Sequence, residues 1–217
     1  MHIERWQLVY FACLIPAIIL HEISHGVVAL FFGDDTAKRA GRLTLNPIPH
    51  IDPFGSIILP ALGVLVGLGA FGWAKPVPVN PAKLRKPRAQ MVWVSLAGPG
   101  TNFLLMIVSA LAARAVAANH PIFDRDPFSN TSGLVVQFLF FFAFANLVLG
   151  LFNLLPIPPL DGSTLIERVL PADWLPRWYR FRPYGILVLF VLVFTTGIVG
   201  RILEPFINSL YRFVLGV

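Results

Sequence analysis

The chain has 217 residues, of which 56% are hydrophobic and only 13% are charged, and its mean hydropathy is +0.73. Because a soluble domain has about 25% charged residues, this composition cannot cover an aqueous surface and predicts an integral membrane protein. The single cysteine, Cys13, excludes a scaffold held by intrachain disulfides. A net charge of +6 would suggest nucleic-acid binding in a soluble protein. Here the basic residues stand in blocks between apolar runs, where they orient helices and contact anionic headgroups, so we expect a lipid bilayer and no nucleic acid as partner.

Four apolar segments are long enough, at about 20 residues or more, to cross the hydrocarbon core of a bilayer as helices. They are residues 6–32, 91–118, 133–155 and 184–203. Residues 54–73 are also apolar but contain five glycines and Pro60, which predicts a re-entrant or interfacial hairpin rather than a straight spanning helix. The short amphipathic tail, residues 205–217, is predicted to lie in the membrane interface.

The loops between these segments differ in charge. Basic residues gather in three of them, residues 33–53, 74–90 and 156–183. Residues 119–132, in contrast, carry one arginine between two aspartates. Because positive loops stay in the cytoplasm, the three basic loops are predicted inside, and residues 119–132 and the N-terminus outside. This topology has four spanning helices, and a fifth at residues 54–73 would violate the charge count. The predicted fold class is an all-α membrane protein, a helical bundle of 4–5 spanning helices forming one domain over residues 1–217.

Three ionisable residues interrupt the first apolar segment in the sequence His21-Glu22-Ile-Ser-His25. On a helix, positions four apart lie on the same face, so the two imidazoles can bind one Zn²⁺ ion. Glu22, next to the first histidine, can act as a base on the attacking water. Ionisable residues inside a membrane are costly and indicate a functional site. The alternative is a structural pair of histidines that hydrogen-bond to neighbouring helices.

A catalytic zinc ion usually has three protein ligands, so a third ligand must lie elsewhere in the chain. The candidates are the carboxylates and three other histidines, His2, His50 and His120. Asp161 is favoured, because it follows an apolar span and a run of prolines that can return its carboxylate to the bundle. The predicted topology also brings it to the same depth as the two histidines. The alternative for Asp161 is an N-cap of the helix that follows.

Several stretches together resemble the site-2 protease family of intramembrane zinc metalloproteases, in its small prokaryotic branch. They are the His-Glu-x-x-His motif in a spanning helix, residues 41–47 (GRLTLNP), 50–55 (HIDPFG), 72–81 (GWAKPVPVNP), 97–102 (AGPGTN) and 153–162 (NLLPIPPLDG). The resemblance covers roughly residues 15–170. It implies zinc held by His21, His25 and Asp161, with Glu22 as the base. No PDZ-like insertion is found, so we expect a minimal enzyme that is regulated in trans.

The resemblance further implies that Asn102 faces the site, where its amide can help zinc stabilise the oxyanion; the alternative is a polar group in helix packing. For Asn146 and Asn153, hydrogen bonding between helices stands beside a role in supporting the metal ligands. The resemblance also implies a membrane-associated strand in residues 41–47. A substrate could pair with its edge at residues 42–45, and the alternative is a plain interfacial loop.

The expected function is that of an intramembrane zinc metalloprotease that cleaves single-span membrane proteins, with a catalytic core over about residues 6–170 and a C-terminal helix and tail over residues 184–217. We expect it in the cell membrane of a prokaryote, with its active site toward the cytoplasm, alone or with a second copy or a regulatory membrane partner. A metal-ion or proton transporter is the alternative, although no inverted repeat is visible. A scaffold with a structural zinc is a third hypothesis, which the base Glu22 argues against.

Overall fold

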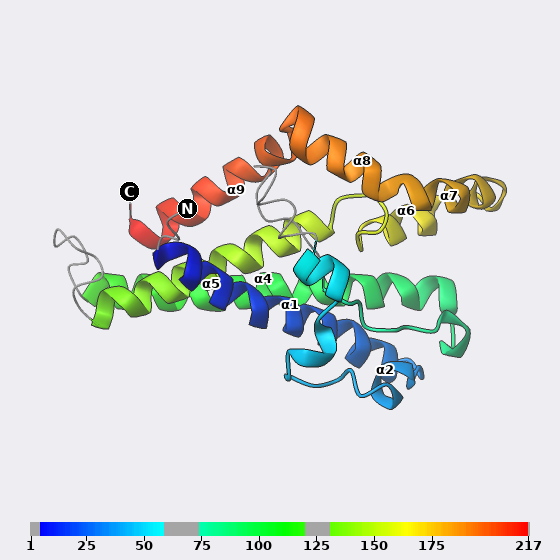
Figure 1. The fold of residues 1–217 in the computed structure, drawn as a ribbon, viewed down its shortest axis with the longest axis horizontal. Coiled ribbons are helices and arrows are strands. Elements are labelled where there is room, and N and C mark those ends of the chain that lie inside the picture. Colours follow the sequence, from blue (N-terminus) through cyan, green and yellow to red (C-terminus); the bar gives the residue numbers. More distant parts are fainter. Residues whose placement is uncertain (1–4, 59–73, 120–130, 217) are drawn as a thin grey trace.

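Three long helices form the body of the protein in a computed structural model that describes residues 5–58, 74–119 and 131–216. Helices α1 (Arg5–Phe31), α4 (Pro87–Asn119) and α5 (Thr131–Asn153) each pack against the other two. Figure 1 shows that α1 and α5 run in the same direction and α4 in the opposite one. The end of α1 therefore lies at the same end of the bundle as the start of α4 and the end of α5.

These three helices are long and apolar enough to cross a membrane, over residues Gln7–Phe31, Pro87–Ala118 and Gly133–Asn153. Lipid offers no hydrogen-bond partners to the backbone, whereas a helix pairs its own N–H and C=O groups. Long apolar segments in a membrane therefore form helices. Large apolar side chains such as Leu104 and Leu111 of α4 are exposed on the outside of the bundle. The described part of the chain is thus an all-α, multi-pass membrane protein, as the composition predicts.

The predicted single spanning helix over residues 184–203 is wrong. The segment is divided into α8 (Gly185–Val191), the π-helical turn η6 (Leu192–Thr196) and the start of α9 (Ile198–Leu215). The break falls at Gly197, whose φ of 63° lies in the left-handed region that ends helices. Just before it, the hydroxyl groups of Thr195 and Thr196 donate to carbonyl groups four residues earlier, a contact that bends helices.

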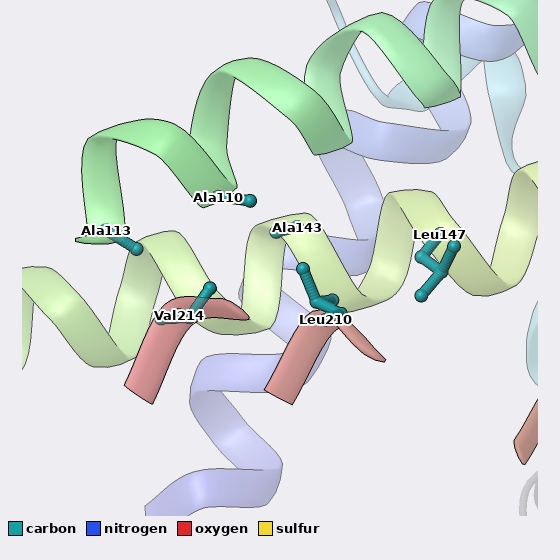
Figure 2. Packing of buried hydrophobic residues seen from close by; sticks show 6 residues of the cluster. All are labelled: Ala110, Ala113, Ala143, Leu147, Leu210 and Val214. Carbon is teal, nitrogen blue, oxygen red and sulfur yellow. The ribbon is translucent and has the colours of Figure 1, made fainter. Parts of the chain in front are cut away.

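The tail from residue 205 continues α9 instead of forming a separate segment. Helix α9 packs on α4 and α5, where Leu210 and Val214 enter a buried cluster. Figure 2 shows these two side chains beside those of α4 and α5. The other buried members of the cluster are Ala110, Ala113, Ala143 and Leu147. The apolar core therefore lies along the last third of α4 and the second half of α5, where α9 packs on both helices.

The connection from α1 to α4 contains short helices and, in its described residues, no strand. They are α2 (Thr36–Arg39), η1 (Ile48–His50), the π-helical turn η2 (Pro53–Ile58) and η3 (Pro81–Lys83). The strand expected in residues 41–47 is replaced by bends. The Arg42 guanidinium donates to the Lys75 carbonyl at 2.6 Å, and the His50 ring contacts the Thr44 carbonyl through Nε2 at 3.0 Å. These side-chain contacts hold the segment, since no neighbouring described strand supplies a ladder of backbone hydrogen bonds.

The hairpin predicted over residues 54–73 lies mostly outside the described residues. Its two described flanks are close together, because the Lys75 N–H donates to the His50 carbonyl at 2.9 Å. After α5, the chain forms α6 (Ser163–Val169), η4 (Ala172–Trp174), α7 (Leu175–Phe181) and η5 (Arg182–Tyr184). Figure 1 shows α6 and α7 at the end of the bundle where α4 starts. The polar connections of the described chain thus gather at the end of the bundle where α1 and α5 end and α4 starts.

Candidate metal centre

His21 and His25 lie one turn apart on α1 and are both buried, with 5% and 9% of their surface exposed. Their Nε2 atoms are 3.1 Å apart. The Asp161 carboxylate meets both rings, with its Oδ2 atom 3.2 Å from His21 Nε2 and 3.3 Å from His25 Nε2. The structure therefore brings the three predicted ligands together, with their ligand atoms within 4.8 Å of one another.

Asp161 reaches the histidines because the chain turns back tightly after α5. The Gly162 N–H donates to the Asn153 carbonyl at 2.7 Å. A Cβ atom on Gly162 would lie 2.2 Å from the Leu154 carbonyl oxygen, so only glycine fits this turn. Gly162 itself occupies the N-cap position of α6, which receives no side-chain cap. The Asp161 side chain thus points to the histidines and does not cap the helix.

A chain of hydrogen bonds fixes how the His21 ring is protonated. The Asn146 amide donates through Nδ2 to the Phe142 carbonyl at 2.8 Å, which leaves Asn146 Oδ1 to accept from Asn102 Nδ2, also at 2.8 Å. Asn102 must then present Oδ1 to His21 Nδ1, 2.6 Å away. Because an amide oxygen only accepts, this His21 nitrogen carries the hydrogen and Nε2 carries a lone pair.

The His25 ring is held in the same tautomer by a different partner. Its Nδ1 atom lies 2.7 Å from the Val94 carbonyl oxygen, which can only accept, so Nδ1 carries the hydrogen. Both Nε2 lone pairs therefore face Asp161 Oδ2. That oxygen is buried and has no hydrogen-bond partner among the described residues. Three acceptors facing one another repel unless a cation lies between them, and two imidazoles with one carboxylate are a ligand set that suits zinc.

Gly98 of α4 leaves the space that the two histidine rings fill. A Cβ atom at this position would lie 2.5 Å from both His21 Cε1 and His25 Nε2. Gly98 belongs to a stretch that resembles the family, but the sequence alone assigns it no role. Its signal was present in the pattern AGPGTN, but only the packing of α4 on α1 shows which of the two glycines meets the histidines.

Glu22 is half-buried and is held by a segment that is distant from it along the chain. Its Oε2 atom accepts from the Val77 N–H at 2.7 Å. Three residues later, the Asn80 N–H donates to the buried Asp34 carboxylate at 2.6 Å. Burial raises the pKa of Asp34, but hydrogen bonds from Thr36 and Asn80 outweigh it and hold that pKa below its ordinary value. Residues 77–80 are thus fixed against the end of α1 beside the candidate base.

The remaining predicted residues lie elsewhere or act indirectly. His50 is buried against Thr44 and is not part of the cluster, while His2 and His120 lie outside the described residues. The Asn153 side chain donates to the Leu149 carbonyl of its own helix at 3.0 Å. Its contribution to the site is its backbone carbonyl, which anchors the turn before α6.

Comparison with known proteins identifies the family. The profile of peptidase family M50 matches residues 9–195, most of the chain. The chain belongs to peptidase family M50. This is the site-2 protease family, and membership together with the His-His-Asp cluster makes the chain a zinc-dependent peptidase.

The curated M50 relatives are bacterial. The chain is 41% identical over 204 residues to the putative zinc metalloprotease YwhC of Bacillus subtilis (strain 168), covering 90% of this chain and 84% of YwhC. It is 31% identical to the putative zinc metalloprotease Rip2 of Mycolicibacterium smegmatis, over 84% of this chain and 65% of Rip2. It is 35% identical to Rip2 of Mycobacterium tuberculosis (strain H37Rv), over 81% of this chain and 62% of that protein. No solved structure matches the chain significantly.

Proposed function

We propose that this chain is an intramembrane metalloprotease whose zinc ion is held by His21, His25 and Asp161 and whose base is Glu22. The observation that carries the proposal is the convergence of two Nε2 lone pairs on the Asp161 Oδ2 atom, which has no hydrogen-bond partner among the described residues. The half-buried Glu22 stands next to His21 in the sequence. A zinc ion held there would lower the pKa of its bound water toward about 7 and so supply the nucleophile at neutral pH.

Glu22 accepts the proton of the attacking water and returns it to the leaving amine of the cleaved peptide bond. The Val77 N–H, which donates to Glu22 Oε2, holds the carboxylate in one orientation and leaves its other oxygen available. A carboxylate with one oxygen tethered in this way is preorganised for proton transfer.

Asn102 is a positioning residue in this proposal and not the donor to the oxyanion. Both ends of its buried amide are engaged, one with His21 and the other with Asn146. Such contacts orient a ligand histidine and raise its basicity. Asn153 supports the site through its backbone carbonyl, since its amide bonds its own helix.

We further infer that the centre opens toward the cytoplasm and that the substrates are single-span membrane proteins. The centre lies at the end of the bundle that carries the basic loops, the side on which positive charge stays during membrane insertion. The equal direction of α1 and α5, with α4 running opposite, agrees with three membrane crossings by these helices, of which the first and third run from outside to inside. The catalytic core is then a single domain over about residues 6–170.

Cleavage of candidate single-span proteins by the purified, zinc-loaded chain in lipid nanodiscs tests the proposal. Glu22→Gln is expected to reduce cleavage by about 100-fold or more while zinc content stays unchanged. A chelator is expected to abolish cleavage by the wild type. The matched control is Glu204→Gln, which neutralises an exposed carboxylate of α9. Wild-type cleavage by Glu22→Gln, or zinc flux across proteoliposomes without any cleavage, would contradict the proposal.

A further inference from the structure

A cavity of about 490 Å³ lies between the start of α4 and helices α6 and α7. This volume is within the range of roughly 300–1,000 Å³ that is usual for small-ligand sites. Its charged lining consists of Arg88, Arg168, Arg182 and Glu167. Three guanidinium groups against one carboxylate leave two positive charges in excess, so the cavity favours an anionic group.

The arginines of the lining are used unequally by the protein itself. Arg88 donates to the carbonyl groups of Glu167 and Leu170 at the end of α6. Arg182 lies 3.5 Å from Glu167 Oε1, an oxygen that already accepts from the Trp178 indole N–H at 3.0 Å. Arg168 is exposed and has neither a hydrogen-bond nor an ion-pair partner in the part of the chain that the structure describes. The cavity therefore retains guanidinium donors for a ligand, and guanidinium groups bind phosphate in pairs of parallel hydrogen bonds.

The other walls of the cavity are apolar, which indicates an amphiphile rather than a free anion. They are formed by Val79, Pro81, Pro87, Met91 and Leu175. Tyr179, which also lines the cavity, is exposed, as are Trp174 and Tyr184, which stand within two residues of the lining residues Leu175 and Arg182 in the sequence. Exposed aromatic side chains beside arginines are typical of the level of the lipid headgroups. Basic pockets between helices at this level bind anionic headgroups.

We propose that this cavity binds the phosphate headgroup of an anionic phospholipid, with the start of its acyl chains against the apolar walls. Arg168 and Arg182 bind the phosphate oxygens. The site adjoins the metal centre without being part of it: Thr164 lines the cavity, and its hydroxyl accepts from Ser95 of α4 at 2.9 Å. Thr164 follows Asp161 by three residues, and Ser95 follows Val94, whose carbonyl holds His25.

Native mass spectrometry of the full, zinc-loaded chain measures this binding independently of proteolysis. The protein is released from mixed micelles that contain either phosphatidylglycerol or phosphatidylcholine with the same acyl chains. We expect retained phosphatidylglycerol in the wild type, and Arg168→Glu is expected to weaken its binding by about tenfold or more. The matched control is Arg180→Glu, which reverses an exposed charge of α7 outside the lining and is expected to change binding by less than about twofold.

Arg182→Gln is a second variant that reduces the cavity charge without reversing it, and we expect weaker binding of phosphatidylglycerol here too. Equal loss in the Arg168→Glu and Arg180→Glu variants would overturn the proposal, because general surface charge would then explain the binding. Equal retention of the two lipids in the wild type would also overturn it. Displacement of phosphatidylglycerol by millimolar inorganic phosphate would assign the cavity to free phosphate and overturn the lipid assignment.

Discussion

Two regions of the interface between helices α4 and α5, a polar end at the metal centre and an apolar end at α9, bury very different side chains. Near the metal centre, α4 buries Ser95 and Asn102, and α5 buries Asn146. Two to three turns further along α4, and on either side of Asn146 in α5, at Ala143 and Leu147, the same helices bury alanine and leucine beside α9, as Figure 2 shows. The polar end is built from hydrogen bonds that converge on two histidines, and the apolar end from close contacts between small side chains.

Within this one pair of helices, the contrast separates the residues that support zinc binding from those that support the stability of the fold. Burying a side-chain amide costs free energy unless both its oxygen and its nitrogen form hydrogen bonds. The buried amides of the polar end are therefore explained by the histidine that they orient. In lipid, small apolar residues associate through packing alone, and the apolar end has no other role in the described structure. We therefore expect substitutions at the polar end to change zinc affinity, and substitutions at the apolar end to change the free energy of unfolding.

Removing the carboxylate of Asp161 is expected to have the largest effect. Asp161→Ala leaves only the two histidine ligands, so zinc affinity is expected to fall by more than about 100-fold. This exceeds the loss that is usual when a residue supporting a ligand is removed. Cleavage is expected to disappear with the zinc. Zinc content by mass spectrometry after dialysis measures this. The control is Asp173→Ala, which removes an exposed carboxylate of η4. Wild-type zinc content in Asp161→Ala would exclude the proposed ligand set.

A methyl group at Gly98 is expected to have the next largest effect. Gly98→Ala places a carbon atom against both histidine rings, so one ring must rotate and zinc affinity is expected to fall by about 10–100-fold. Gly100→Ala adds the same methyl group two residues away, where it meets nothing within 4 Å beyond its chain neighbours and the nearby backbone of its own helix. It is expected to keep zinc and to gain about 0.5–1 kcal/mol of stability, because alanine favours helix. Equal zinc affinities in the two variants, by competition with a chromophoric chelator, would refute the packing argument.

Breaking the amide chain is expected to have a smaller effect on the same quantity. Asn146→Leu leaves Asn102 Nδ2 without its acceptor, so Asn102 can rotate away from His21, and zinc affinity is expected to fall by about tenfold. Asn153→Leu removes an amide that bonds only its own helix and is expected to leave zinc affinity unchanged. Isothermal titration with zinc compares the two variants. A larger loss in Asn153→Leu would mean that the amide chain does not position His21.

The apolar end is expected to respond only in stability. Leu210→Ala leaves space between α9, α4 and α5, and is expected to lower the free energy of unfolding by about 2 kcal/mol, since in lipid only packing is lost. Ile202→Ala, at an exposed position of the same helix, is expected to change it far less. Unfolding in detergent mixtures gives the difference, and zinc affinity is expected to be equal in both variants. A loss of zinc affinity in Leu210→Ala would show that the two ends are coupled.

The sequence was informative where the controlling interactions are local. The spacing of His21 and His25 places both rings on one helical face whatever the rest of the chain does. Apolar length predicts the helices at residues 6–32, 91–118 and 133–155, because backbone in lipid must satisfy itself. Hydropathy missed the helix break at Gly197, because the surrounding residues are apolar although the Gly197 backbone is in the left-handed region. The family resemblance was misleading at residues 41–47, where it implied a strand that lacks a described neighbour to pair with.

The sequence by itself determined that this is a membrane protein with a His-Glu-x-x-His helix, and it indicated Asp161 as the third ligand. The tertiary structure decided how the site is held: Gly98 makes room for the rings, Asn146 and Asn102 orient His21, and Val77 tethers Glu22. These contacts join residues that are distant along the chain, and each depends on how α1, α4 and α5 pack together. Composition and spacing report only the preferences of each segment, so the partners of a buried polar group become visible only when the helices are assembled.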